Sequence, residues 1–281
     1  MNTFIRLNIV IPDHLHEIFI SSFDQLEFSG FEQDDGRIYA YINQQDLNDT
    51  GREELEAWLM AQRDECYIES EELIEERNWN QEWESTIRPQ RIGKFVITPT
   101  WANPQVNRED IVIEIDPKMA FGTGYHETTR LMLRLLPEVI SKGDRVLDAG
   151  TGSGVLAIGA LKLGAAHALG FDNDEWSYQN ATENALLNHV SERLVIKDGD
   201  ADTIDTRQSY DVVLANINRN ILMEMAELLT SVTKTGGNLV LSGLMLKDEE
   251  TILNHPPFNA FDQIKSIYEN EWVAVWLKKP A

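Results

Sequence analysis

The sequence predicts a doubly wound, Rossmann-like α/β sheet that ends in an antiparallel hairpin, preceded by a small α+β domain of the ferredoxin-like kind. Three observations lead to this prediction. The first part of the chain orders its patterns as strand, helix, strand, strand, helix, strand. From residue 145 onward strand-like and helix-like runs alternate, which is typical of a parallel sheet with crossover helices. The last two extended runs lie too close together for such a helix, so we expect them to pair antiparallel.

The length of the chain favours two domains. Its 281 residues with 42% hydrophobic content can bury a large core, and a single domain typically takes ~100–200 residues. We expect a ferredoxin-like domain at 1–74, a linker at 75–101 and a second domain at 102–281. Trp79 and Trp83 lie one helical turn apart, which predicts a linker helix that packs on the domains.

The N-terminal domain is expected to contain four strands and two helices. Its strand-like runs are 4–10, 28–32, 37–43 and 66–70, and its helical runs begin near Pro12 and Asn48. The middle two strands flank Asp34-Asp35-Gly36, a good hairpin turn because glycine accepts positive φ at little cost. Two hairpin-linked strands between two helices complete the split βαβ pattern.

The second domain is expected to begin with a strand at 111–115 and to continue as a doubly wound sheet. Further strands are predicted at 145–149, 168–172, 194–197, 211–216 and 238–242, with helices that begin near Ser153, Asp174 and Arg219. The closing hairpin pairs 261–268 with 272–277. A parallel sheet finished by such a hairpin is the usual signature of the common methyltransferase fold.

Charge and composition exclude several classes of function. With 24 basic and 47 acidic residues, the formal charge of -23 repels a phosphate backbone, so we expect no direct binding of nucleic acid. The single cysteine, Cys66, cannot form an internal disulfide, and no Cys/His cluster has the spacing of a zinc site, so no metal is expected. The sequence shows no leader pattern and no run of ~18 apolar residues, which predicts a soluble, cytoplasmic protein without a membrane partner.

A glycine-rich loop is the strongest candidate for a ligand site. Residues 146–154, Val-Leu-Asp-Ala-Gly-Thr-Gly-Ser-Gly, place a strand ahead of alternating glycines, among them Gly150 and Gly152, which let the backbone approach a ligand closely. The loop also matches a dinucleotide-binding fingerprint. Asp172, 22 residues beyond Gly150, ends the next predicted strand and is placed to accept hydrogen bonds from ribose hydroxyls.

Asp148 helps to distinguish a dinucleotide from S-adenosylmethionine as the cofactor. An anion just ahead of the glycines is unfavourable beside the pyrophosphate of a dinucleotide, whereas it is favourable beside the sulfonium and ammonium of S-adenosylmethionine. The balance therefore moves to methyl transfer. A carboxylate that caps the loop is the alternative interpretation of Asp148, and it is compatible with the same site.

Residues 116–129, Asp-Pro-Lys-Met-Ala-Phe-Gly-Thr-Gly-Tyr-His-Glu-Thr-Thr, resemble a segment of the ribosomal protein L11 methyltransferases (PrmA), Asp-Pro-Gly-x-Ala-Phe-Gly-Thr-Gly-x-His-x-Thr-Thr. Further matches are Trp-Asn-Gln-Glu-Trp at 79–83, Val-Leu-Ala-Asn-Ile at 213–217 and Leu-Ser-Gly at 241–243. The resemblance covers most of the chain. In the N-terminal domain it lies mainly in the order of strands and helices.

The resemblance implies roles for particular residues, all around S-adenosylmethionine as the cofactor. The cofactor-binding positions that it gives are Phe121, Gly122, Thr123, Gly124, Thr129, Gly150, Asp172 and Asn216, which join Asp148 and Gly152. Asn216, at the carboxyl end of its strand, is the candidate catalytic residue because its amide oxygen can accept a hydrogen bond from an incoming amine.

Three neighbouring positions have more ordinary interpretations. Asn218 stands where the family usually has leucine, and a cap on the next helix is favoured over a change in the acceptor pocket. Lys118 stands where the family commonly has glycine, which leaves the shape of the loop open. His126 precedes a helix, where capping or loop packing is favoured over proton transfer.

The resemblance implies methylation of lysine side chains and the α-amino group of ribosomal protein L11. Residues 1–90 hold 21 Asp or Glu and 6 Lys or Arg, so the N-terminal domain is expected to dock this basic substrate on an acidic face. Another basic protein as substrate, a dinucleotide-dependent oxidoreductase and a noncatalytic cofactor-binding module are the alternatives.

Overall fold

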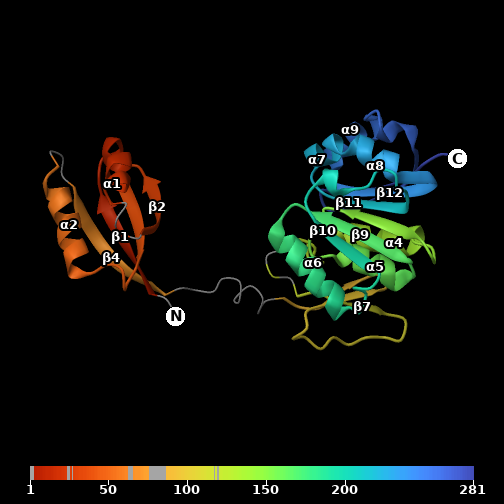
Figure 1. Ribbon diagram of the computed structural model, residues 1–281, viewed down its shortest axis with the longest axis horizontal. Coiled ribbons are helices and arrows are strands. Elements are labelled where there is room, and N and C mark those ends of the chain that lie inside the picture. The colour runs from red at the N-terminus through yellow and green to blue at the C-terminus, as the bar shows by residue number, and fades with distance from the viewer. Residues whose placement is uncertain are drawn as a thin grey trace. The chain divides into compact units, whose positions relative to one another are not determined.

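The computed structural model describes residues 3–23, 26, 28–62, 66–75, 87–116, 118 and 120–281. The chain divides into two compact units, Met1–Glu82 and Trp83–Ala281 (Figure 1). The helix predicted around Trp79 and Trp83 lies outside the described residues. No helix in the described part of the chain is long and apolar enough to cross a membrane.

The N-terminal unit has the predicted ferredoxin-like order. Its elements are β1 (Thr3–Val10), η1 (Asp13–Leu15), α1 (His16–Ser22), β2 (Phe28–Asp34), β3 (Arg37–Asn43), α2 (Asp49–Met60) and β4 (Tyr67–Glu75). The antiparallel sheet has the order β2-β3-β1-β4. Strand β4 runs five residues beyond its predicted end because it pairs with β1 along that whole length. Within this part, Glu71 and Glu72 form ion pairs with Arg52 and Arg6.

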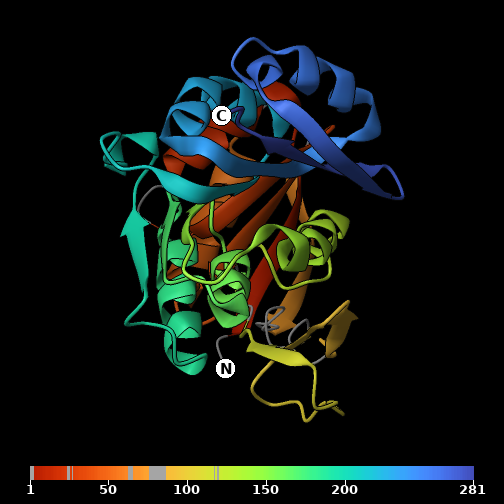
Figure 2. The same cartoon turned by 90° about the vertical axis from the view of Figure 1, so that its right-hand side faces the viewer.

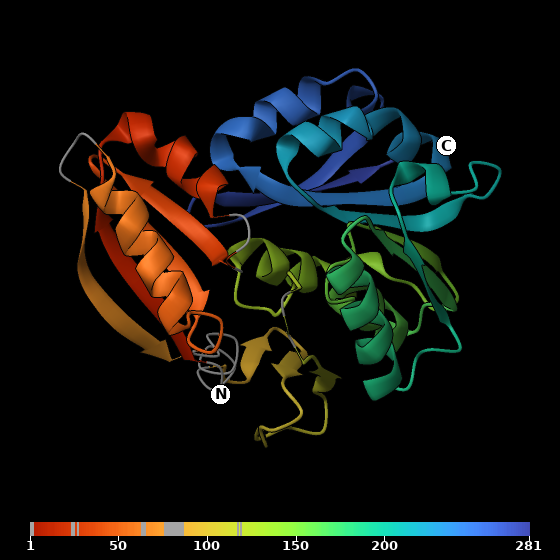
Figure 3. The ribbon, with the colours of Figure 1, turned by 60° about the vertical axis from the view of Figure 1, so that its left-hand side comes forward.

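One face of this sheet is covered by both helices, as Figure 3 shows. Alternate residues of β1, such as Leu7 and Ile9, are buried against Phe19 of α1 and Leu55 of α2. Helix α2 begins where predicted, because the Asn48 side chain accepts a hydrogen bond from the Gly51 N–H. The period-two burial of the strands therefore builds a single core between sheet and helices.

The second unit contains a seven-stranded sheet of the order β10-β9-β8-β11-β12-β14-β13. Its strands are β8 (Arg145–Ala149), β9 (His167–Asp172), β10 (Leu194–Asp198), β11 (Tyr210–Asn216), β12 (Thr233–Met245), β13 (Asp262–Glu269) and β14 (Trp272–Lys278). The first five are parallel, and β14 pairs antiparallel with both β12 and β13. The predicted parallel sheet with a closing hairpin is confirmed.

Helices cover both faces of this sheet (Figure 2). They are α4 (Glu127–Val139), α5 (Val155–Leu163), α6 (Glu175–Leu187), α7 (Arg219–Glu224), α8 (Ala226–Val232) and α9 (Glu249–Asn254), with short turns η2 (Ala201–Thr203), η3 (Leu246–Asp248) and η4 (Phe258–Ala260). Helices α4 to α6 share one core with Val146 of β8, whereas α7 to α9 share the other with its neighbour Leu147. A strand buried on both faces explains the continuous apolar run in the sequence.

A small sheet of order β5-β6-β7 precedes helix α4. It consists of β5 (Gln90–Ile92), β6 (Phe95–Thr98) and β7 (Ile111–Glu114). Only the last of these strands is predicted, because the first two lie in the stretch that the sequence predicts to be a linker. Phe95 and Ile97 are buried in the same core as α4, so this part of the expected linker is folded.

Candidate functional site

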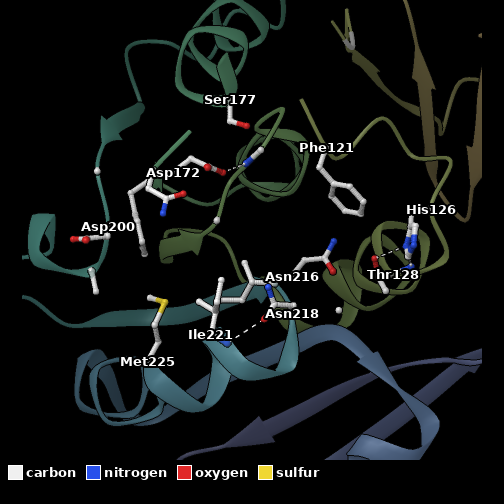
Figure 4. Close-up of a pocket in the computed structure, with 18 of the residues that line it drawn as sticks. Phe121, His126, Thr128, Asp172, Ser177, Asp200, Asn216, Asn218, Ile221 and Met225 are labelled. Carbon is white, nitrogen blue, oxygen red and sulfur yellow. Dashed lines mark hydrogen bonds between the residues drawn. The ribbon is translucent and has the colours of Figure 1, made fainter. Parts of the chain in front are cut away.

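A pocket of about 440 Å³ opens where the carboxyl ends of β8, β9 and β11 meet. Five of the residues predicted from the sequence line it, namely Phe121, Gly150, Gly152, Asp172 and Asn216. Figure 4 shows Asp172 on one side, Phe121 on the other and Asn216 between them. The two halves of the predicted site, cofactor loop and acceptor-binding amide, therefore face one cavity.

The glycines of the loop are required by its geometry. Gly150 and Gly152 have φ of 66° and 54°, in the left-handed region that favours glycine. A Cβ on Gly152 would lie 2.5 Å from the backbone oxygen of Phe121, and one on Gly150 would overlap the side chain of Ile217. The loop thus brings its backbone against two neighbouring segments and leaves no room for side chains.

Asp172 joins the loop to the end of β9. One carboxylate oxygen accepts a hydrogen bond from the Gly152 N–H at 2.9 Å, and the other accepts one from the Asp174 N–H at 3.2 Å. These bonds orient the carboxylate at the rim of the pocket. Each carboxylate oxygen keeps further acceptor capacity, so Asp172 can also bind the hydroxyl groups of a ribose.

The side-chain oxygen of Asn216, Oδ1, accepts no hydrogen bond from the described residues. Asn216 Nδ2 donates to Thr129 Oγ1 at 3.4 Å, which fixes the amide, while Oδ1 is buried and has no partner among the described residues. A buried carbonyl oxygen without a donor costs about 1–3 kcal/mol. The arrangement is therefore suited to a ligand that brings an N–H group to this oxygen.

Asp148 lies beneath the loop and does not line the pocket. Its Oδ2 accepts hydrogen bonds from Thr151 Oγ1 at 2.8 Å and from the Ala157 N–H at 3.2 Å. Burial raises the pKa of this carboxyl to about 6. These contacts are those expected of a carboxylate that caps the loop, and the preference of Asp148 for a cationic cofactor stays a prediction.

The remaining predicted positions do not line the pocket, although most of them contact residues that do or that lie next to it. Thr129 is fully buried next to Asn216. The Gly122 carbonyl accepts a hydrogen bond from Ser153 Oγ at 2.9 Å, and Gly124 packs close to Ile97 of the small sheet. Thr123 is half-buried and lies outside the pocket lining. The structure thus uses this segment to hold Phe121 over the glycine loop.

His126 and Asn218 both cap helices, as the sequence favours. The Asn218 side chain accepts a hydrogen bond from the Ile221 N–H at 3.1 Å. His126 Nδ1 accepts one from the Thr128 N–H at 3.3 Å. Nδ1 is therefore the ring nitrogen that serves the helix cap.

Lys118, which stands where the family commonly has glycine, has a backbone conformation with positive φ. Its φ is 41°, a value that is uncommon for residues with a side chain. The side chain forms an ion pair with Glu183 of α6. A lysine at this position is therefore compatible with a backbone conformation that glycine adopts more readily.

Several lining residues escape the sequence prediction, among them Ser177, Asp200, Ile221, Met225 and Trp272. Asp200 follows β10 after a glycine, so the reasoning used for Asp172 applies to it equally well. Trp272 opens β14 and reaches the pocket only through the pairing of the final hairpin, a contact that the local sequence does not reveal.

Comparisons with known proteins identify the family. The family model described as "Ribosomal protein L11 methyltransferase (PrmA)" matches residues 13–280. A ribosomal protein L11 methyltransferase of Chlorobaculum tepidum is 35% identical over 276 residues, covering 96% of this chain and 94% of that one. One from Desulfotalea psychrophila is 34% identical over 282 residues, covering 96% and 93%.

A solved structure agrees with these relatives. The crystal structure of a ribosomal protein L11 methylase from Lactobacillus delbrueckii subsp. bulgaricus superposes with a TM-score of 0.64 at 28% identity, covering 69% of this chain and 100% of that one. The resemblance found in residues 116–129 is confirmed. The chain belongs to the ribosomal protein L11 methyltransferase (PrmA) family.

Proposed function

We propose that the unit Trp83–Ala281 transfers methyl groups from S-adenosylmethionine to amino groups of ribosomal protein L11, at lysine side chains and at the α-amino group. The observation that supports this proposal best is the buried Oδ1 of Asn216, which has no hydrogen-bond partner in the described part of the chain. Asn216 lies between Asp172 and the aromatic side of the pocket. An amine nitrogen brings the N–H donor that this oxygen lacks.

The residues of the pocket fit the cofactor. S-adenosylmethionine supplies a methyl group on a positively charged sulfur, which is an excellent leaving group. Asp172 would accept the ribose hydroxyls, and the glycine loop would let the backbone approach the rest of the molecule. A volume of about 440 Å³ lies within the ~300–1,000 Å³ that small-molecule sites usually have.

The main contribution of this site to catalysis would be to position the acceptor amine relative to the methyl group of the cofactor. Asn216 Oδ1 would hold the acceptor nitrogen by one N–H and so direct its lone pair toward the cofactor side of the pocket. The amine has to arrive neutral, and partial removal from water lowers a lysine pKa from its ordinary value of ~10.4. His126 is already committed to its helix cap, so the proton is lost to water.

Substrate docking is assigned to the acidic N-terminal unit. Glu53, Glu54 and Glu56 of α2, here called the α2 acidic cluster, all point to solvent. Three acids of β4 that contribute to the same negative total are engaged in ion pairs with arginines, namely Glu69, Glu71 and Glu72. The α2 acidic cluster is therefore the better candidate for attracting a basic ribosomal protein, in the cytoplasm where such proteins are made.

The test is intact-mass spectrometry of unmethylated ribosomal protein L11 after incubation with the enzyme and S-adenosylmethionine. We expect mass gains in methyl steps, and a rate about 10²-fold lower for Asn216→Ala because the acceptor is no longer oriented. Asn220→Ala, an exposed amide on α7 outside the pocket lining, is the matched control. No mass gain with the unaltered enzyme would exclude L11 as substrate, and full activity of Asn216→Ala would exclude the role of Asn216.

A further inference from the structure

Three aromatic rings from three separate segments line one end of the pocket. They are Phe121 of the cofactor loop, His126 at the start of α4 and Trp272 at the start of β14. The His126 ring centroid lies 5.2 Å from that of Phe121 and 4.7 Å from that of Trp272, with tilted and edge-on geometry. Figure 4 shows Phe121 and His126 on the side of the pocket toward which the amide of Asn216 points.

Trp272 is held in place by contacts of the hairpin that precedes it. Glu269 accepts a hydrogen bond from Arg130 Nε at 2.7 Å, and the Asn270 amide donates to Glu127 at 2.9 Å. Both partners lie in the first turn of α4, directly after His126. These contacts fix the start of β14, and with it Trp272, to helix α4 before any ligand binds. Little conformational entropy of these side chains is therefore lost on binding.

The charged groups of the pocket lie at the opposite end. Among the described lining residues the carboxylates are Asp172 and Asp200, and Figure 4 places both across the pocket from His126. Among the described lining residues, the aromatic end therefore offers a cation three rings and no carboxylate. Ring faces attract ammonium groups through the aromatic quadrupole, and they bind quaternary ammonium as well, because no N–H donor is needed.

We propose that Phe121, His126 and Trp272 form a subsite for the acceptor nitrogen that retains it through successive methylations; this inference rests on the proposed function. The occupant is a flexible, unhindered alkylamine in its unmethylated, mono- and dimethylated states, and finally the trimethylammonium product. Each transfer forms an N–C bond and breaks the C–S bond of the donor, whose electron pair stays on sulfur. The two N–H protons still present on the neutral primary amine are released to water over the series.

This subsite explains how the acceptor nitrogen is held once it has too few N–H groups to bind Asn216. Each methyl group replaces an N–H, so the hydrogen bond to Asn216 Oδ1 is available to primary and secondary amines and is lost for a tertiary amine. Ring faces hold the nitrogen regardless of how many methyl groups it carries. The last transfer should therefore depend on the rings more than the first.

Binding to the full-length protein, loaded with S-adenosylhomocysteine, tests the subsite directly. The probes are Nα-acetyl-Nε-trimethyllysine amide and its neutral isostere, in which carbon replaces the charged nitrogen. We expect the charged probe to bind about 3- to 10-fold more tightly, a preference that Trp272→Phe keeps and Trp272→Leu and Phe121→Leu reduce to about one. Phe121 is half exposed, so its variant is expected to fold, and Trp101→Leu, an exposed tryptophan outside the pocket lining, should keep the preference.

Equal affinity for the two probes in the unaltered protein, or a preference that survives in both leucine variants, would overturn the inference. A time course on ribosomal protein L11 gives the second readout. Phe121→Leu should slow the third methylation at least fivefold more than the first, and an equal slowing of all three steps would contradict the subsite. If the unaltered enzyme left L11 unmethylated while still preferring the charged probe, the proposed substrate would fail and the subsite would stand.

Discussion

Replacing Asp148 by asparagine tests the account of the buried carboxyl beneath the glycine loop. The side chain is completely buried, and its Oδ1 has no hydrogen-bond partner among the described residues. Asparagine has nearly the same shape and keeps an oxygen that can accept the bonds from Thr151 and Ala157. The change removes the titration of this position, and the amide nitrogen that takes the place of Oδ1 adds a cost that does not depend on pH.

The magnitude follows from the pKa. Burial raises the pKa of Asp148 from 3.8 to about 6, and one pH unit of difference corresponds to about 1.4 kcal/mol. Because the folded-state pKa is raised, the contribution of this carboxyl to stability is fully present below pH ~4 and is lost as the pH rises through ~6. Between pH ~3 and pH ~8 the group lowers the free energy of unfolding by about 3 kcal/mol, with roughly half of the change between pH 5 and pH 7.

The assay is urea-induced unfolding of the unaltered protein and of Asp148→Asn at several pH values, followed by tryptophan fluorescence. Five of the seven tryptophans lie in Trp83–Ala281, so the signal reports mainly on the unit that contains Asp148. The stability of the variant relative to the unaltered protein should increase with pH across the window. Asp262→Asn, at an exposed position of β13, controls for the loss of one carboxylate.

A relative stability that stays constant between pH 5 and pH 7, or that decreases, would refute the reasoning. Such a result would mean that the burial of Asp148 does not disfavour its ionised form. The loop would then stabilise the carboxylate through contacts that the hydrogen bonds at Oδ2 do not account for.

Three further predictions concern the loop, the cofactor and docking. Gly152→Ala should weaken S-adenosylhomocysteine binding at least tenfold in calorimetry, because its Cβ would meet the Phe121 carbonyl, whereas Gly236→Ala, with positive φ but open space, should leave the affinity unchanged. Asp172→Asn should raise the same dissociation constant about tenfold through loss of the charged acceptor, and an unchanged value would exclude ribose binding there. Neutralising the α2 acidic cluster with glutamines should slow association with ribosomal protein L11 severalfold at low salt and flatten the salt dependence; identical rates would rule out docking by this charge.

The sequence was sufficient for the architecture wherever the determinants are local. Strand boundaries of the large sheet agree to within one or two residues for β8 to β11, because buried apolar runs end at polar residues and glycines. The beginning of β12 is the exception, since Gly236 and Gly237 read as a turn although they lie inside the strand. Helix starts at Asn48, Asp174 and Asn218 agree because each is a side-chain cap.

The candidate site was harder to predict because part of it depends on contacts between distant segments. Glycine spacing and the acid after a strand locate Gly150 and Asp172, which line the pocket. The sequence around Asp148 is the same for a carboxylate that faces a ligand and for one that caps a loop. The hydrogen bonds of Asp148 to the loop and to α5 appear only in the structure. Trp272 reaches the pocket through strand pairing, which no local pattern encodes.

The place of β14 in the sheet affects the order in which the pocket forms while the protein is being synthesised. This strand is inserted between β12 and β13 although it follows both in the sequence, and it brings Trp272 to a pocket whose loop begins near Phe121. A nascent chain therefore has Phe121, His126 and the glycine loop long before it has Trp272. Synthesis must pass residue 272 before the pocket can close, so cofactor capture is expected late in translation, after the N-terminal unit has had time to fold.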